Sequence, residues 1–257
     1  MSTALITLCD HGARVARCLA AKLGDCQVYL HESVTEPMDA ERFPAVVKLT
    51  ERIFNRYPRL VYIAPCGVVV RAIAPMLRNK LSDPAVVVID VGGRYAVSLL
   101  SGHEGGANQL ALEVANAIGA EPVISTTTEA VKTLIVGVGC RRGAKAESIA
   151  GAIRAALDKV GAGVEEVRFL ASAYLKSDEA GLLQAAQELG LSLRFLSADE
   201  ILSTTKQFGH SQWVADRVKL PAVAEPSALL AGRRTKLLLP KTIINGVTVA
   251  IARENSL

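Results

Sequence analysis

The segment from Ser98 to Asn108 gathers the side chains best suited to act on a bound molecule. It reads Ser-Leu-Leu-Ser-Gly-His-Glu-Gly-Gly-Ala-Asn. His103 and Glu104 are candidate general bases, because each can take a proton from water. An imidazole, with an ordinary pKa near ~6.5, exchanges protons at neutral pH, whereas the pKa of a carboxyl group must first be raised by burial. We therefore predict that His103 is the residue most needed for chemistry and that Glu104 is its rival.

The same segment is predicted to bind negative charge. It leaves an apolar strand and opens a helix, so the N–H groups of Gly105 and Gly106 should face a ligand. Ser101 and Asn108 add polar side chains beside them. The alternative is a tight turn in which Asn108 caps the helix and His103 is merely exposed. Histidine beside glycines in a strand-to-helix loop favours the functional interpretation.

A second candidate segment, Gly137–Gly143, follows another apolar strand and reads Gly-Val-Gly-Cys-Arg-Arg-Gly. The segment matches the fingerprint of a dinucleotide-binding loop only weakly, because Arg142 stands where that fingerprint requires its third glycine. As an anion site it is better: Gly139 permits close approach, and Arg141 and Arg142 can bind carboxylates through two parallel hydrogen bonds. Cys140 is more consistent with a small buried filler than with a nucleophile.

A third candidate lies after the strand Leu60–Ala64. Gly67 opens a helix there and exposes backbone N–H groups at a strand end. Arg71 follows one turn later in an otherwise apolar helix. Its position fits an arginine that faces an anion about as well as one that extends its charge to solvent.

These segments must be positioned by alternating strands and helices. Short apolar runs predict strands over Leu5–Cys9, Gln27–Leu30, Leu60–Ala64, Val86–Asp90, Tyr95–Leu100, Pro122–Ser125, Leu134–Gly139, Val167–Ala171, Leu193–Leu196, Lys236–Leu239 and Val247–Ala252. Helical patterns cover Gly12–Leu23, Ala45–Tyr57, Gly67–Leu77, Ala107–Ile118, Lys145–Val160 and Glu179–Leu189. Gly92-Gly93 and Asn245-Gly246 predict hairpins.

The alternation predicts an α/β protein of two three-layer α/β/α domains with mostly parallel sheets, residues 1–130 and 131–257. The candidate loops follow strands, so we expect them at the carboxyl ends of the sheets, in a cleft between the domains.

Composition excludes several classes of protein. The 257 residues are 50% hydrophobic and carry a net charge of +4, too small and too scattered for a nucleic-acid groove. No run of 18 apolar residues predicts a membrane span. Five cysteines without a CxxC pair and no secretory signal indicate reduced thiols and a cytoplasmic location. Four histidines predict no dedicated metal site.

Four stretches of the first half and three of the second resemble the CbiG family of cobalamin biosynthesis, the cobalt-precorrin-5A hydrolases. The first set is Gly67–Pro75, Asp83–Asp90, Ser98–Ala111 and Gly119–Thr128. The second set, which resembles the family's C-terminal domain and the CobE-like proteins, is Gly137–Gly143, Lys176–Leu182 and the closing pair Leu239–Lys241 and Val247–Ala252. The chain departs from the family in having no middle domain before Leu134, and in having Val91 where an acidic residue is common.

The resemblance implies a reaction that opens a lactone on a ring-contracted cobalt-corrinoid and releases acetaldehyde, giving cobalt-precorrin-5B. Cobalt would arrive with the substrate, so no cofactor is expected. His103 or Glu104 would be the base. The implied substrate-binding residues are Gly67, Arg71, Ser101, Gly105, Gly106, Asn108, Gly139, Arg141, Arg142 and Lys176. Other cobalamin-pathway enzymes and a second copy of the chain are candidate partners; nucleic acid and membranes are not expected.

Two other functions stay open at this point. Without the middle domain, the chain could be a non-catalytic corrinoid carrier. A nucleotide-dependent α/β enzyme rests only on the imperfect glycine pattern of Gly137–Gly143.

Overall fold

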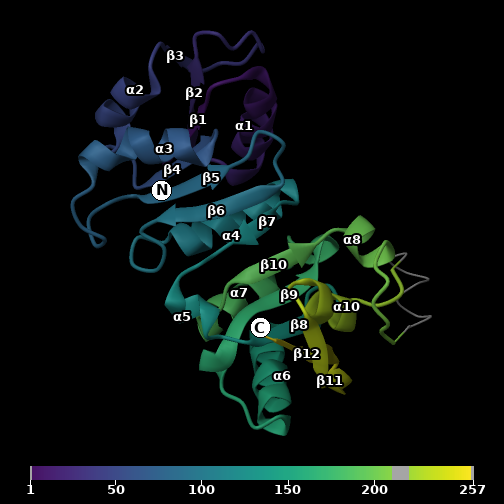
Figure 1. Ribbon diagram of the computed structural model, residues 1–257. Coiled ribbons are helices and arrows are strands. Elements are labelled where there is room, and N and C mark those ends of the chain that lie inside the picture. The colour runs from purple at the N-terminus through teal and green to yellow at the C-terminus, as the bar shows by residue number, and fades with distance from the viewer. Residues whose placement is uncertain (1, 210–219, 256–257) are drawn as a thin grey trace. The chain divides into compact units, whose positions relative to one another are not determined.

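The computed structural model describes residues 2–209 and 220–255 and divides into two units, Met1–Thr128 and Glu129–Leu257 (Figure 1). Each unit has its own sheet, and helices pack against both faces of it. This arrangement confirms the predicted class, two α/β units with mixed, largely parallel sheets.

The sheet of the first unit has seven strands in the order β3-β2-β1-β4-β5-β6-β7. The strands are β1 (Thr3–Thr7), β2 (Cys26–His31), β3 (Glu41–Phe43), β4 (Arg59–Ile63), β5 (Ala85–Ile89), β6 (Tyr95–Leu100) and β7 (Glu121–Val123). Neighbouring strands are parallel except β5 and β6, which form an antiparallel hairpin. Its turn contains Gly93 at φ +68°, a conformation that glycine adopts at little cost. The predicted Gly92-Gly93 hairpin is therefore confirmed.

Helices α1 (Asp10–Leu23) and α4 (Ala107–Ile118) cover one face of this sheet, and α2 (Val46–Ile53) and α3 (Cys66–Ile73) cover the other. A 3-10 turn, η1 (Ala74–Met76), extends α3, and α5 (Thr127–Ala130) lies at the boundary between the units. Every residue of β5 is buried, because both faces of that strand are covered. The short edge strand β3 was not predicted, and α2 is shorter than the pattern suggested.

The second unit has five strands in the order β10-β9-β8-β12-β11. They are β8 (Leu134–Gly139), β9 (Val167–Ala173), β10 (Leu193–Leu196), β11 (Thr235–Ile244) and β12 (Val247–Glu254). The first three run parallel, and β12 and β11 add an antiparallel edge through the Asn245-Gly246 turn, both of whose residues have positive φ. That predicted hairpin is also confirmed.

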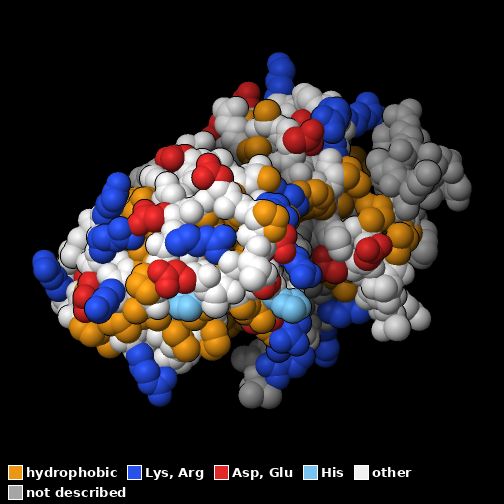
Figure 2. Space-filling model, turned by 90° about the horizontal axis from the view of Figure 1, so that it is seen from above, with side chains coloured by type: hydrophobic (Ala, Val, Ile, Leu, Met, Phe, Trp, Pro, Cys, Tyr) orange, Lys and Arg blue, Asp and Glu red, His pale blue; other side chains and the backbone are white. Residues whose placement is uncertain are grey.

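Helices α6 (Ala146–Lys159) and α7 (Ala180–Leu189) pack on one face of the second sheet, and α8 (Ala198–Leu202) and α10 (Ala224–Leu230) pack on the other. Two 3-10 turns, η2 (Val164–Glu166) and η3 (Tyr174–Lys176), precede and follow β9. None of the helices in the described residues is long and apolar enough to span a bilayer. On the face shown in Figure 2, acidic and basic side chains are interspersed.

Candidate functional site

The residues predicted to form one site in the first unit lie at opposite edges of its sheet. The carboxyl ends of β4 and β5 meet where Ile63 pairs with Ile89, and Ile89 pairs with Ala96 near the start of β6. The end of β6 instead pairs with the beginning of β5, through Leu100 and Val86. The Ser101–Asn108 loop, hereafter the histidine loop, therefore lies at the amino edge of the parallel strands. The expectation that it lies at their carboxyl edge is wrong, because the β5–β6 hairpin reverses the chain.

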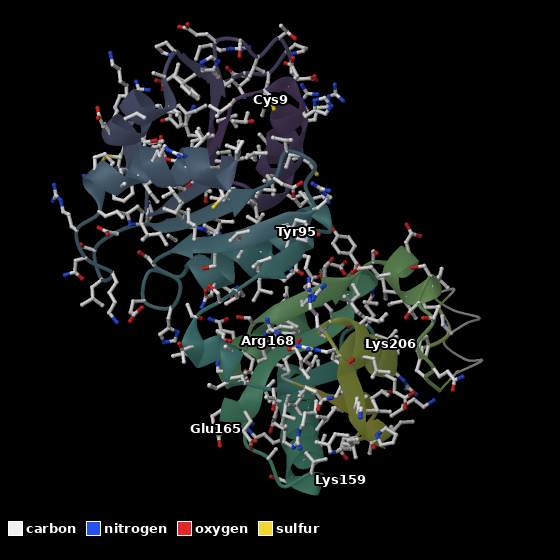
Figure 3. All side chains as sticks on the ribbon, in the orientation of Figure 1. Cys9, Tyr95, Lys159, Glu165, Arg168 and Lys206 are labelled. Carbon is white, nitrogen blue, oxygen red and sulfur yellow. The ribbon has the colours of Figure 1, made fainter. Side chains whose placement is uncertain are left out.

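Gly67 and Arg71 occupy the other edge. Gly67 lies in the first turn of α3, directly after the carboxyl end of β4, and Arg71 lies in its last turn; both are exposed. The Arg71 guanidinium folds back and donates a hydrogen bond to the Gly67 carbonyl, 2.9 Å away. Cys9 and Tyr95, labelled in Figure 3, mark the same carboxyl edge at the starts of α1 and β6. Within the first unit, Gly67 and Arg71 thus do not join the histidine loop.

The histidine loop is folded around Ser101. This residue is 7% exposed and its backbone has φ +58°, a left-handed conformation that residues other than glycine rarely adopt. Its hydroxyl donates to the Asp83 carbonyl at 3.0 Å, and its own carbonyl accepts hydrogen bonds from the N–H groups of Gly105 and Ala107. Ser101 therefore holds the loop in place, and its hydroxyl is directed inward.

The glycines of the loop serve different purposes. The Gly105 N–H is already bonded to Ser101, so the expected role of that amide in substrate binding is corrected. A Cβ on Gly105 would lie 2.3 Å from the Ser101 Cβ, so close packing requires glycine there. Gly106 is the N-cap of α4 at φ +84°, and its N–H finds no acceptor in the described part of the chain. Gly106 therefore keeps the amide that could contact a ligand.

The alternative interpretation predicted that Asn108 caps α4, but Asn108 does not cap this helix. It is 9% exposed, its Oδ1 accepts from the Ser98 hydroxyl at 2.8 Å, and its Nδ2 donates to Thr126 Oγ1 at 2.9 Å. Its N–H donates to the Gly102 carbonyl. Asn108 thus joins β6, the histidine loop and the segment after β7, with both polar atoms of its side chain bonded within the unit.

The two candidate bases are exposed at the tip of the loop, and their surroundings distinguish them. Lys80 Nζ lies 2.6 Å from Glu104 Oε1, and this hydrogen bond holds the pKa of the Glu104 carboxyl below its ordinary value. A base that works near neutral pH would need that pKa raised. The environment of Glu104 therefore disfavours it as the base and leaves His103 as the stronger candidate.

In the second unit the predicted residues share one edge. Gly139 ends β8 and Arg141 and Arg142 follow it, whereas Lys176 follows β9, and these two strands are parallel. Lys176 is 9% exposed and its Nζ lies 3.2 Å from Glu179 Oε2, while the other oxygen of Glu179 accepts from the Gly143 N–H at 2.8 Å. The buried pair therefore holds the end of this loop, hereafter the arginine loop (Gly139–Gly143).

The arginines differ from the expectation in one respect. Arg142, which was expected to bind a ligand carboxylate, forms two hydrogen bonds with the Asp178 carboxylate, at 3.1 and 3.3 Å. Both side chains are more than 60% exposed, so the pair is in contact with water rather than buried. Such a pair is weak enough for a ligand carboxylate to compete with it. Arg141 is exposed beside it.

Cys140 belongs to the arginine loop and is half-buried, and this burial raises the pKa of its thiol. Because a raised pKa leaves less thiolate at any given pH, Cys140 should react slowly at pH 7 and faster as the pH rises. We expect iodoacetamide at pH 7 to modify the exposed Cys18 well before Cys140, with the difference narrowing as the pH is raised. Peptide mass spectrometry measures both rates. Equal rates at pH 7 would revive Cys140 as a nucleophile.

The glycine pattern of the second unit has a packing explanation. Gly137 lies inside β8, and a Cβ there would be 1.9 Å from the Ala224 carbonyl oxygen of α10. This glycine admits a helix backbone rather than a phosphate. The structure therefore removes the support for a nucleotide loop. Across residues 2–209 and 220–255, no three His, Cys, Asp or Glu side chains are grouped as metal ligands.

Sequence reasoning missed the residues that hold the two loops in place. Asp83 and Lys80 fix the histidine loop from the segment before β5, Thr126 fixes it from beyond β7, and Glu179 fixes the arginine loop. The sequence shows Lys176-Ser-Asp-Glu179 as a run of polar residues, which could have indicated the role of Glu179. The contacts of Asp83 and Thr126 depend on the hairpin register and had no local signal.

Comparison with known families assigns each unit separately. Residues 48–129 match the family model described as Cobalamin synthesis G N-terminal, and residues 134–252 match Cobalamin synthesis G C-terminus. The two matches fall on either side of the boundary between the units.

Three relatives carry the comparison further. A protein named cobalt-precorrin-5A hydrolase from Priestia megaterium is 26% identical over 352 aligned positions, covering 97% of this chain and 94% of the relative. A protein of the same name from Salmonella typhimurium is 40% identical over 50% of this chain and 36% of its own length. Protein CobE from Sinorhizobium sp is 30% identical over 48% of this chain and 83% of its own length.

These matches define an α/β protein that combines both terminal regions of the cobalamin synthesis G proteins. The chain belongs to the CbiG family, and its second unit includes the CobE-like region. The alignment with the Priestia megaterium relative is longer than the 257 residues of this chain, so that relative has residues at positions where this chain has none.

Proposed function

We propose that the protein is a cobalt-precorrin-5A hydrolase, which opens the lactone of the ring-contracted corrinoid and releases acetaldehyde to give cobalt-precorrin-5B. The observation that carries the proposal is the histidine loop: a family motif held rigidly by Ser101 and Asn108, with His103 exposed at its tip. The names of two relatives supply the substrate.

The first step is addition of water to the lactone carbonyl. His103 takes a proton from the water as its oxygen bonds to the carbonyl carbon. The carbonyl oxygen becomes negatively charged, and the free Gly106 N–H at the start of α4 can stabilise that charge. When the tetrahedral intermediate collapses, the ring C–O bond breaks and the alkoxide takes up a proton. The products are an alcohol and a carboxylic acid, which ionises to the carboxylate by releasing a proton to water.

The second step releases the two-carbon unit. A base removes the proton of the new hydroxyl group, a carbonyl forms as the carbon–carbon bond to the macrocycle breaks, and the electron pair remains on the macrocycle. The neutral imidazole of His103 can serve again, because it returned its first proton to the leaving alkoxide. The sum consumes one water molecule and releases one acetaldehyde.

Substrate carboxylates are proposed to bind the arginine loop. Arg141 and Arg142 project two exposed guanidinium groups from one strand end, and the Lys176–Glu179 pair fixes the loop behind them. Planar guanidinium groups match carboxylates through two parallel hydrogen bonds. Because Arg142 also pairs with Asp178, substrate binding and that ion pair would compete.

This competition gives a test of Arg142. Arg142→Ala should weaken corrinoid binding, whereas Asp178→Asn should leave binding unchanged or tighter, since it frees the guanidinium. Both variants should keep the thermal midpoint of the wild type, because the pair is exposed. Titration with cobalt-precorrin-5A measures the affinities. If both variants weaken binding equally, Arg142 acts only through Asp178 and the proposed contact is wrong.

The second candidate function is that of a non-catalytic corrinoid carrier. It is favoured because this chain lacks residues that the Priestia megaterium relative, which is named a hydrolase, has. An assay with purified protein and cobalt-precorrin-5A separates the two functions. A hydrolase consumes the corrinoid and releases acetaldehyde over many turnovers. A carrier binds the corrinoid and returns it unchanged.

A further inference from the structure

Thr126 touches the histidine loop from a distant part of the chain. It lies between the end of β7 at Val123 and the start of α5 at Thr127, two residues before the boundary between the units. Its hydroxyl accepts a hydrogen bond from Asn108 Nδ2 at 2.9 Å. Its Cγ2 methyl packs against Gly102, where an added Cβ would lie only 2.6 Å away.

These contacts hold both ends of the segment that carries His103. Gly102 immediately precedes His103 and packs between Thr126 and Asn108 Oδ1. Asn108 follows the loop, and its own N–H donates to the Gly102 carbonyl at 2.9 Å. Ser98 adds a further hydrogen bond to this group of contacts, because its hydroxyl donates to Asn108 Oδ1. The Asn108 side chain is 9% exposed, so an N–H of its amide that loses its partner would stay largely shielded from water.

We infer that Thr126 is a positioning residue for His103, acting through Asn108 and Gly102 and rooting the histidine loop in the segment that leads to the second unit. The inference rests on the proposed function, because it takes His103 as the base. Thr126 contributes two separable contacts, a hydroxyl to Asn108 and a methyl to Gly102.

Two substitutions separate these contacts. Thr126→Val removes the hydroxyl but keeps a methyl toward Gly102, whereas Thr126→Ser keeps the hydroxyl and removes the methyl. Because loss of a partly buried hydrogen bond costs more than loss of one methyl contact, Thr126→Val should lower kcat about five- to tenfold at unchanged KM. Thr126→Ser should stay within about twofold of the wild type. Thr128→Val, at an exposed threonine of α5, is the matched control.

Hydrogen exchange supplies a readout that does not depend on catalysis. The N–H groups of Gly105, Ala107 and Asn108 bond to the carbonyls of Ser101 and Gly102, so they report whether the loop is held. They should exchange faster in Thr126→Val than in the wild type and be unchanged in Thr128→Val. Unchanged exchange or unchanged kcat in Thr126→Val would overturn the inference. Absence of turnover in the wild type would sink the proposed function alone, and exchange would still decide whether Thr126 holds the loop.

Discussion

Replacing His103 by alanine should lower turnover of cobalt-precorrin-5A at least about a hundredfold, because removal of a general base typically costs that much. Binding should survive, since the imidazole is exposed and holds no other part of the loop. Single-turnover rates and a binding titration measure the two effects separately.

Glu104→Gln is the matched control for this prediction. The Lys80 hydrogen bond keeps the pKa of Glu104 low, so this carboxylate is a poor proton acceptor near neutral pH. Glutamine keeps an oxygen that can accept from Lys80 and so hold the loop, and the substitution should therefore change turnover little. Near-normal turnover in His103→Ala, with a large loss in Glu104→Gln, would transfer the role to Glu104. Near-normal turnover in both would point to a carboxylate of the substrate acting on itself.

Gly105→Ala should disrupt the histidine loop without unfolding the sheet. The added Cβ would meet the Ser101 Cβ at 2.3 Å and the Ser101 carbonyl oxygen at 2.9 Å, so one of the two segments must move. Overpacking of this kind costs about 1–3 kcal/mol of folding free energy. Displacing His103 by about 1 Å should lower turnover about a hundredfold. Urea denaturation and steady-state kinetics provide the measurements.

Gly151→Ala is the comparison for that variant. Gly151 lies inside α6, where an added Cβ meets no atom within 4 Å, so alanine should stabilise the helix by about 1 kcal/mol and leave turnover unchanged. Unimpaired turnover in Gly105→Ala would show that the loop tolerates rearrangement, contrary to the rigid site described above.

Most of the fold could be predicted from the sequence because its strands are short apolar runs with clear ends. The strands Tyr95–Leu100, Leu134–Gly139 and Leu193–Leu196 and the helix Ala107–Ile118 were placed to the residue. The strand β3 was not predicted because Glu41–Phe43 is too short to show the alternation of apolar and polar residues that marks a strand. Gly137 was placed in its strand, yet it was also assigned to a candidate ligand-binding segment, because its packing against α10 joins residues that are distant in the sequence.

The candidate site was harder to predict than the fold. Gly92-Gly93 indicated the hairpin, and an antiparallel β6 must end beside the start of β5, where Leu100 pairs with Val86. The expectation of a site at the carboxyl edge did not take this reversal of the chain into account. The conformation of Ser101 and the inward direction of its hydroxyl depend on Asp83. Local patterns show which residues can act, whereas the pairing of strands decides which of them meet.

The most direct test of the proposed hydrolase is the yield of acetaldehyde when the 257-residue chain is the only protein added to cobalt-precorrin-5A. In water enriched in oxygen-18, the proposed mechanism predicts one equivalent of acetaldehyde per corrinoid consumed and one labelled oxygen in the new carboxylate. A corrinoid that is bound by the chain, recovered with its lactone intact and accompanied by no acetaldehyde would contradict it and leave a carrier as the function of this chain.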